Sequence, residues 1–198
     1  WCEHLVVRDE VTNAIVGTYR ILTAERAKRL GSFYSETEFD LTRLKRLRSA
    51  ICETGRACIH PSYRTGPAIM LLWQGIATLM RERGCRYLIG CASISMADGG
   101  ADAVQVWRNT AETHLAPIEY RVFPRYPLLV REEAASSPAT VVPRAARPPA
   151  LLRAYLRMGA WIGGEPAWDP DFNTADLFVF LPLARVEARY ARHYLKAA

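Results

Sequence analysis

Residues 49–75 read SAICETGRACIHPSYRTGPAIMLLWQG, and this stretch decides the fold. Its first part, residues 50–60, is rich in apolar residues and predicts a strand that ends at His60-Pro61. A basic turn with a glycine, residues 62–67, follows, and a strongly apolar helix begins directly after it. Backbone amides at such a turn and at a helix N-terminus bind anions. The stretch therefore predicts a site for a phosphate or a pantetheine-like group.

The strand within this stretch carries an acid and an arginine, Glu53 and Arg56, which are our candidates for chemistry. Side chains alternate between the two faces of a regular strand, so these two would point in opposite directions. Gly55 lies between them, and a bulge at Gly55 would bring both toward one side. A carboxylate in this position can remove the proton that an attacking amine must lose, directly or through one water. The alternative is that Glu53 pairs with Arg56 and only holds the strand.

The rest of the chain alternates between segments that predict strands and segments that predict helices. Strands are predicted at residues 2–8, 14–22, 86–94 and 177–183, and helices at residues 67–83, 101–115, 151–161 and 184–196. Residues 119–130 have strand character that Pro124 and Pro127 break. The first two strands form a hairpin, and Gly17 in the second predicts a bulge or a close backbone approach. Strands that lead into helices through short turns favour an α/β or α+β fold around one mixed sheet.

A polar segment, residues 31–47, connects the hairpin to the central strand and predicts an ordinary surface connection. Its acidic residues are Glu36, Glu38 and Asp40. Carboxylates near a site that receives an amine could instead hold that amino group by charge-assisted hydrogen bonds. Both interpretations stay open from the sequence.

Composition limits the classes of protein that the chain can belong to. It has 198 residues, 50% of them hydrophobic, and 26 Lys and Arg residues against 20 Asp and Glu residues, for a net charge of +6. An excess of arginine favours acidic partners such as phosphates, an acidic carrier protein or an anionic membrane, unless it is only a compositional preference. We do not expect a nucleic-acid partner, because no compact basic run is interleaved with aromatic residues.

The cysteines give no sign of a disulfide framework or of a metal site. There are five, at positions 2, 52, 58, 85 and 91, and no CxxC pair occurs. We expect most of them, among them Cys52 and Cys58, to be small core residues in a reducing cytoplasm.

Two predicted helices near the end of the chain carry basic residues at helical spacing. These residues are Arg153, Arg157, Arg189 and Arg192. They form either a solvated face or a surface that contacts an acidic carrier protein or anionic lipid headgroups.

Six runs of sequence resemble one known family. They are FYSETEFD (residues 33–40), ETGRACIHPSYR (53–64), LLWQGI (71–76), YLIGCAS (87–93), PPALLRAYLRMGAWI (148–162) and FNTADLFVFLP (172–182). Together they resemble the ornithine Nα-acyltransferase family, also called hemolysin-like, which belongs to the GNAT superfamily. This family is similar to acyl-homoserine-lactone synthases and long-chain N-acyl amino acid synthases. The resemblance covers nearly the whole chain.

The resemblance implies a GNAT-like mixed sheet flanked by helices, with splayed strands that form a cleft for the acyl donor. Residues 1–198 would be a single domain that lacks the family's N-terminal segment, and residues 131–198 its C-terminal extension. The implied reaction moves a long-chain acyl group, often 3-hydroxylated, from acyl carrier protein to the α-amino group of ornithine, and forms a lyso-ornithine lipid. The resemblance implies no cofactor or metal beyond the acyl carrier protein co-substrate. It implies that the protein is located in the cytoplasm or peripherally at the inner membrane surface. The alternatives are tyrosine or another acceptor, or a non-catalytic lipid-binding or membrane-active protein.

The resemblance also implies roles for particular residues. Glu53 would be the base, and Arg56 would orient it or neutralise charge near the thioester. The pantetheine arm and its phosphate would meet Ala57, Cys58, Ile59, Arg64, Thr65, Gly66, Ala68, Cys91 and Ser93. The aromatic residues Trp73, Trp107 and Phe178 would be core residues or line a pocket for the acyl chain. We do not expect covalent catalysis by Cys91 or Ser93, because no histidine lies near either in the sequence.

Overall fold

The computed structural model describes residues 1–128 and 146–186. The chain forms two compact units. Unit 1 comprises Trp1–Phe33, Arg46–Gly90 and the chain from Leu181 onward, and unit 2 comprises Tyr34–Lys45 and Cys91–Phe180.

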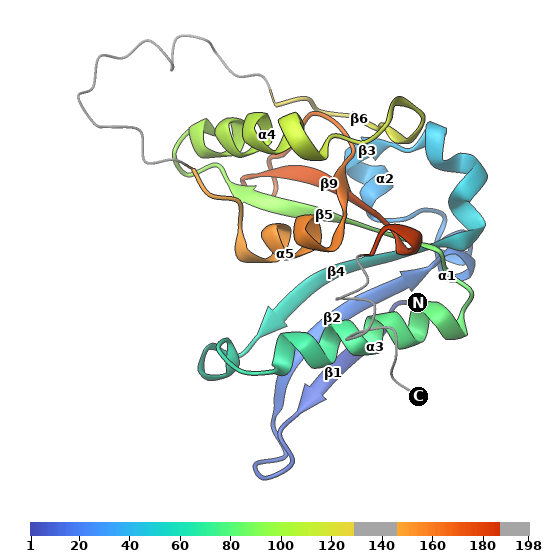
Figure 1. Ribbon diagram of the computed structural model, residues 1–198, viewed down its shortest axis with the longest axis vertical. Coiled ribbons are helices and arrows are strands. Elements are labelled where there is room, and N and C mark those ends of the chain that lie inside the picture. The colour runs from blue at the N-terminus through green and yellow to red at the C-terminus, as the bar shows by residue number, and fades with distance from the viewer. Residues whose placement is uncertain (129–145, 187–198) are drawn as a thin grey trace. The chain divides into compact units, whose positions relative to one another are not determined.

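Unit 1 is built on a sheet that begins with the predicted hairpin (Figure 1). Strand β1 (Glu3–Arg8) pairs antiparallel with β2 (Ile15–Thr23), and β2 pairs antiparallel with β4 (Ile51–Ile59). The other edge of β4 pairs parallel with the first residues of β5 (Tyr87–Ser95). The sheet is therefore mixed, and the predicted hairpin and central strand are confirmed.

Helix α3 (Ala68–Glu82) covers one face of the β1–β2–β4 sheet (Figure 1). Its buried side chains follow the predicted helical spacing and include Leu72, Trp73, Ile76 and Met80. A Cβ on Gly17 would lie 3.3 Å from Leu72 Cδ1, so the glycine of β2 allows the helix to approach closely. The close backbone approach predicted at Gly17 is thus confirmed.

Short helical segments connect these elements. They are α1 (Ala24–Leu30) and the 3₁₀ helices Thr42–Ala50, Pro61–Tyr63 and Leu183–Arg185. The hairpin turn is joined to the turn after β4, because the Tyr63 hydroxyl donates a hydrogen bond to Asp9 Oδ2 at 3.0 Å. Asp9 Oδ1 also accepts the amide of Thr12 at 2.7 Å, and these hydrogen bonds lower the pKa of the Asp9 carboxyl.

Unit 2 has its core around strand β9 (Thr174–Pro182), whose side chains are almost all buried. The strand pairs antiparallel with β7 (Trp161–Ile162) and β8 (Ala167–Asp169). Phe178 of β9 packs on Phe39 with ring centroids 5.6 Å apart. The other elements are α2 (Ser35–Glu38), β3 (Phe39–Asp40), α4 (Ala101–His114), a 3₁₀ helix (Ile118–Tyr120), β6 (Phe123–Pro124) and α5 (Ala150–Met158).

Three sequence predictions are wrong in their extent. Of the strand predicted at residues 119–130, with breaks at Pro124 and Pro127, the described part up to residue 128 contains only the two residues of β6, because proline cannot donate to a ladder. The helix predicted at residues 151–161 ends at Met158, where Gly159 adopts a φ of 105° and caps it. The connection predicted at residues 31–47 contains α2 and β3.

The helix predicted at residues 184–196 lies mostly outside the described residues, and Leu183–Arg185 form a 3₁₀ turn. With these corrections, the predicted fold class holds: the chain is a mixed α/β protein whose sheet is flanked by helices.

Candidate functional site

Strand β4 contains a β-bulge directly after Gly55. Gly55 pairs with Arg20 of β2, and Cys58 pairs with Thr18, so two residues of β4 face the single residue between them on β2. Arg56, the first of the two, has a φ of 55°, in the left-handed region that non-glycine residues rarely adopt. A bulge is therefore present directly after Gly55, at Arg56 and Ala57, and the predicted placement of Glu53 and Arg56 on one side stays a prediction.

The pairing register shows which residues share a face of the sheet. Glu53 pairs with Leu22 and Gly55 with Arg20, and residues that pair directly point to the same side. A Cβ on Gly17 would point toward α3, and side chains along β2 alternate between the two faces of the sheet. The odd-numbered residues of β2 therefore face α3, and the even-numbered residues Arg20 and Leu22 face away from it. Glu53 therefore lies on the face opposite α3, together with Gly55 and Arg20.

The bulge also changes the position of Cys58. Because β4 has one extra residue, Cys58 shares the face of Glu53 and Gly55, and its side chain is exposed. The prediction that Cys58 is a core residue is wrong, because Arg56, Ala57 and Cys58 form an exposed run at this end of the strand. Cys52 comes before the bulge and is fully buried, as predicted.

Glu53 lies in the buried half of the strand and is its last residue that pairs with β5. It is 1% exposed, and it pairs with Ile89 of β5 at the end of a parallel register that starts at Ile51 and Tyr87. Three residues beyond it, Arg56 begins an exposed segment. A carboxylate that is shielded from solvent but adjacent to an open strand end can accept a proton through one water molecule.

Arg20 is a residue of this site that the sequence reasoning missed. A Cβ on Gly55 would lie 3.0 Å from Arg20 Nη2, so the guanidinium lies over the glycine, on the face of Glu53. Only the strand register reveals this neighbour, because Arg20 and Gly55 are far apart in the sequence. The available signal was the glycine itself, since a glycine within a strand often marks a close approach.

The turn after β4 is largely organised by its own hydrogen bonds. Arg64 Nε donates to Ile59 O at 3.2 Å, and the Gly66 amide donates to Tyr63 O at 3.2 Å. Thr65 is exposed, and Ala68 begins α3 as a buried residue. The predicted phosphate contacts at Arg64, Thr65, Gly66 and Ala68 stay a prediction, with the amide of Gly66 already used within the turn.

The other residues predicted for the acyl donor belong to both units. Ala57, Cys58 and Ile59 follow the bulge in unit 1, whereas Cys91 and Ser93 lie on the part of β5 in unit 2. The Cys91 Sγ atom is 3.6 Å from Ser35 Oγ, and the Ser93 hydroxyl donates to the Asp176 carboxylate. The cleft between these segments stays a prediction.

The aromatic residues predicted for an acyl pocket are packed within their own units. Trp73 of α3 is 7% exposed in unit 1, and Phe178 of β9 is fully buried in unit 2. Trp107 of α4 donates its indole N–H to Gly164 O at 3.0 Å. These contacts fit the core role that the sequence left open, and a role in a pocket stays a prediction.

Unit 2 contains an acidic cluster that we define as Glu38, Asp169 and Asp176. Asp169 and Asp176 are buried, and Glu38 is half-buried. Burial raises the pKa of Asp176, the charge of Asp169 adds to the rise, and a hydrogen bond from Ser93 opposes it. Burial also raises the pKa of Glu38. Asp40, in contrast, caps the next turn through Thr42 N at 2.7 Å, which helps to lower its pKa.

Replacing Asp176 by Asn is expected to stabilise the protein at pH 8. The folded state raises the pKa of Asp176 above the ordinary 3.8, so wild-type stability falls as the pH rises from that value through the folded pKa. Removing the buried charge should raise the free energy of unfolding at pH 8 by about 1 kcal/mol and the Tm by about 2–4 °C. The gain should vanish below pH 3.8, where both states carry the proton.

Thermal melts of the Asp176→Asn protein across this pH range measure the effect. Asp171→Asn is the control, because Asp171 is an exposed acid nearby. A lower Tm at pH 8 would mean that the hydrogen bonds from Ser93 and Thr174 require the carboxylate.

Replacing Arg56 by Gly is expected to separate stability from activity. Glycine adopts a φ of 55° without strain, whereas a non-glycine residue in this conformation costs about 1–2 kcal/mol. The Tm should therefore stay within a few degrees of the wild-type value or rise, while loss of the guanidinium lowers activity by more than roughly tenfold. A folded variant with full activity would remove Arg56 from the site, and a large fall in Tm would assign it to the fold.

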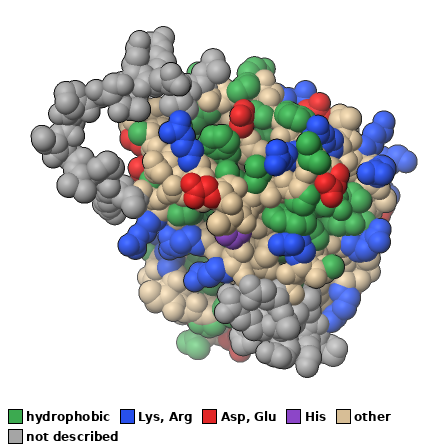
Figure 2. Space-filling view, turned by 45° about the horizontal axis from the view of Figure 1, so that its top comes forward, with side chains coloured by type: hydrophobic (Ala, Val, Ile, Leu, Met, Phe, Trp, Pro, Cys, Tyr) green, Lys and Arg blue, Asp and Glu red, His purple; other side chains and the backbone are tan. Residues whose placement is uncertain are grey.

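Basic side chains are spread over the face of the molecule shown in Figure 2, with only scattered acidic side chains between them. Arg153 and Arg157 lie on the exposed side of α5, opposite the buried Leu152 and Tyr155, which confirms that this helix is amphipathic. Arg153 Nη1 donates to Pro148 O at 2.7 Å. The predicted contacts at Arg189 and Arg192 lie outside the described residues.

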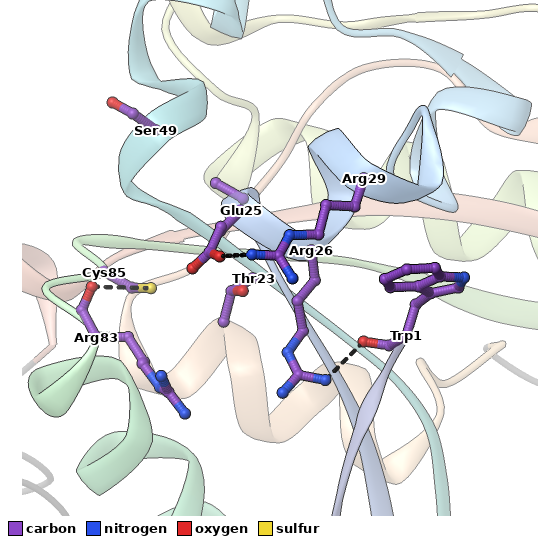
Figure 3. Close-up of a pocket in the computed structure, with 9 residues that line it drawn as sticks. Trp1, Thr23, Glu25, Arg26, Arg29, Ser49, Arg83 and Cys85 are labelled. Atoms are coloured by element: carbon purple, nitrogen blue, oxygen red, sulfur yellow. Dashed lines mark hydrogen bonds and ion pairs between the residues drawn. The ribbon is translucent and has the colours of Figure 1, made fainter.

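A pocket of about 370 Å³ lies in unit 1, at the ends of β2 and α3 (Figure 3). Its residues are Trp1, Thr23, Ala24, Glu25, Arg26, Arg29, Ser49, Arg83 and Cys85. Arg26 and Arg83 form ion pairs with Glu3 at 2.6 and 3.3 Å, and Arg29 pairs with Glu25 at 2.6 Å. The positive charge of the pocket is thus largely compensated, and none of the predicted site residues lines it.

Within residues 1–128 and 146–186, no helix is long and apolar enough to cross a membrane. Among the same residues, no group of three or more His, Cys, Asp or Glu side chains could hold a metal ion.

The class of the protein follows from the segment that carries β4 and its bulge. Residues 1–74 match the family model of the acetyltransferase (GNAT) domain. The chain is 34% identical to the L-ornithine N(alpha)-acyltransferase of Brucella abortus (strain 2308), over 98% of this chain and 71% of that protein. It is 33% identical to that of Rhizobium meliloti (strain 1021), over 98% of this chain and 68% of that protein.

The chain belongs to the L-ornithine Nα-acyltransferase family, and it is an acyltransferase. The resemblance inferred from the six runs of sequence is confirmed. Among solved structures, a CoA-dependent acyl-homoserine lactone synthase matches with a TM-score of 0.46 and 9% identity, over 98% of this chain and 65% of that chain. A likeness at this level carries no argument about the site.

Proposed function

We propose that the protein transfers a long-chain fatty acyl group, 3-hydroxylated in the preferred substrate, to the α-amino group of ornithine. The observation that supports this proposal is the buried carboxylate of Glu53 close to the bulge of β4. The relatives of the chain that bear the name L-ornithine N(alpha)-acyltransferase support ornithine as the acceptor. The acyl donor is the thioester of acyl carrier protein, and the product is a lyso-ornithine lipid.

The chemistry assigned to the site needs only a base and donors for an oxyanion. An ammonium group has no free lone pair, so Glu53 accepts the proton that the acceptor amine loses before attack. The amine then attacks the thioester carbonyl and forms a C–N bond. As the tetrahedral intermediate collapses, the C–S bond breaks, and the thiolate of the pantetheine arm leaves and takes up the second proton that the nitrogen loses. Backbone amides that follow Arg56 on the irregular strand stabilise the tetrahedral oxyanion, and the Arg56 guanidinium adds positive charge.

The donor is assigned to a carrier protein on the basis of charge. Carrier proteins of this class are acidic, and the chain carries a net charge of +6. The exposed Arg153 and Arg157 of α5 present two of these charges one helical turn apart. We assign to this helix the contact with the carrier protein or with anionic lipid headgroups at the cytoplasmic face of the membrane.

The experiment incubates the purified protein with ornithine and either a 3-hydroxyacyl thioester of acyl carrier protein or the matching coenzyme A thioester. Mass spectrometry of the products identifies the acylated amine. Acyl-ornithine formed faster from the carrier-protein thioester is the expected result. A different N-acyl amino acid from an amino-acid mixture would keep the mechanism and correct the acceptor. An acyl chain bound without turnover by folded protein would contradict the proposal and favour a lipid-binding protein.

A further inference from the structure

We propose that Arg20 binds the α-carboxylate of the amino-acid acceptor, on the face of the sheet that carries Glu53. The inference rests on the proposed function, because it assigns a second group of the acceptor to the same site. It concerns the group that all α-amino acids share, so it does not depend on which amino acid is the acceptor.

The position of the guanidinium is fixed by the strand register. Arg20 pairs with Gly55 and Leu22 pairs with Glu53, so Arg20 and Glu53 are neighbours along one face. Two residues along a strand span about 7 Å, and both side chains are long enough to meet over this distance. An α-amino acid carries its amine and its carboxylate on one carbon. A carboxylate base and a guanidinium side by side can therefore engage both groups at once.

Gly55 is what allows this arrangement. A Cβ at that position would lie 3.0 Å from Arg20 Nη2, tighter than nearly all real contacts of a Cβ atom. Without a side chain at Gly55, the planar guanidinium can lie against the strand backbone. Gly55 has an ordinary negative φ, so its backbone conformation alone does not demand glycine.

The surroundings suit a charged, water-soluble ligand. Arg20 is half-buried, and the strand beyond Gly55 is exposed at Arg56, Ala57 and Cys58. A guanidinium binds a carboxylate through two parallel hydrogen bonds, and partial burial strengthens such a pair because water competes less for it. The α-carboxylate of the acceptor, held by Arg20, would orient the α-amine of the acceptor toward Glu53. The site would therefore select an α-amino acid over a simple amine.

The test compares two acceptors that differ only in the carboxylate, ornithine and 1,4-diaminobutane. Arg20→Gln should raise the KM for ornithine about 100-fold with little change in kcat, since an interaction with the substrate is lost before the chemical step. The low kcat/KM for 1,4-diaminobutane should be the same in wild type and variant. Arg20→Lys should restore part of the affinity, because it keeps the charge but not the planar fork.

Two further variants sharpen the comparison. Gly55→Ala moves the guanidinium by a few tenths of an ångström and should raise the KM for ornithine by a smaller factor than Arg20→Gln. Arg8→Gln, which removes an exposed arginine from β1, is the matched control and should behave as wild type.

An equal loss of kcat/KM for both acceptors in Arg20→Gln would overturn the proposal, because Arg20 would then act through Glu53 or through the fold. Unchanged kinetics for ornithine would overturn it as well. Calorimetric titration with ornithine separates this inference from the proposed function, because binding requires no acyl donor. Binding to wild type but not to Arg20→Gln supports the role of Arg20 even if no acyl transfer occurs, and equal binding or no binding to wild type refutes it.

Discussion

Replacing Glu53 by Gln should lower kcat for acyl transfer to ornithine by roughly 100- to 10,000-fold, the usual contribution of a general base. Gln keeps the size and the hydrogen-bonding ability of the side chain, but it cannot accept the proton from the acceptor amine. Because Glu53 is 1% exposed and lies within the paired part of β4, the substitution places a neutral amide where a buried carboxylate was. The fold should therefore persist.

The pH dependence gives this prediction a second readout. Without a base, the variant depends on acceptor molecules that are already deprotonated in solution. Their fraction reaches one half at the α-amino pKa of about 8 and continues to rise above it. The residual rate of Glu53→Gln should therefore continue to rise with pH where the wild-type rate has levelled off. Glu82→Gln, an exposed glutamate at the end of α3, is the control and should keep full activity. Full activity in Glu53→Gln, with an unchanged pH profile, would show that Glu53 is not the base.

Replacing Gly90 by Ala should also have a large effect. It should lower the stability of the protein by disturbing the packing of β5 against β4, the strand that holds Glu53. A Cβ at Gly90 would lie 2.5 Å from the carbonyl oxygen of Thr54, the residue directly after Glu53. The clash is with backbone, which cannot rotate away as a side chain can, so β4 and β5 must move apart. We expect a loss of about 1–3 kcal/mol in the free energy of unfolding, a Tm lower by about 5 °C or more, and reduced activity because Glu53 shifts with its strand.

Gly66→Ala is the control for this change. A Cβ at Gly66 would lie 3.5 Å from Tyr63 O, which is an ordinary van der Waals distance, and the residue is exposed. Thermal melts of the two variants give the comparison of stability. Equal Tm values for Gly90→Ala and wild type would show that the strand pair can relax and that Gly90 does not set the position of Glu53.

Local signals explain what the sequence could predict. Helix α3 has a clear helical period of buried residues between Pro67 and Gly84, and the hairpin has a polar turn between two apolar runs. The candidate base was found because it lies on the strand directly before the predicted anion-binding turn and because the family resemblance implies an acid there. The short strands β3 and β6 have no period that could be detected, since each has only two residues.

The features that sequence reasoning missed depend on pairing between distant segments. Arg20 joins the site through the register of β2 with β4, and Asp176 meets Ser93 from another strand. Neither partner can be read from spacing along the chain. The exposure of Cys58 was missed because its apolar neighbours in the sequence predict a buried strand, whereas residues 56–58 of β4 are all exposed.

The bulge divides β4 into two parts that tolerate change differently. Residues 51–54 are all buried, whereas Arg56, Ala57 and Cys58 are all exposed. A library of variants that randomises the exposed part would therefore leave the hydrophobic core untouched, while the same library placed four residues earlier would yield mostly unfolded protein. For a protein engineer, this single strand offers a rigid support and a variable surface that begins at the bulge.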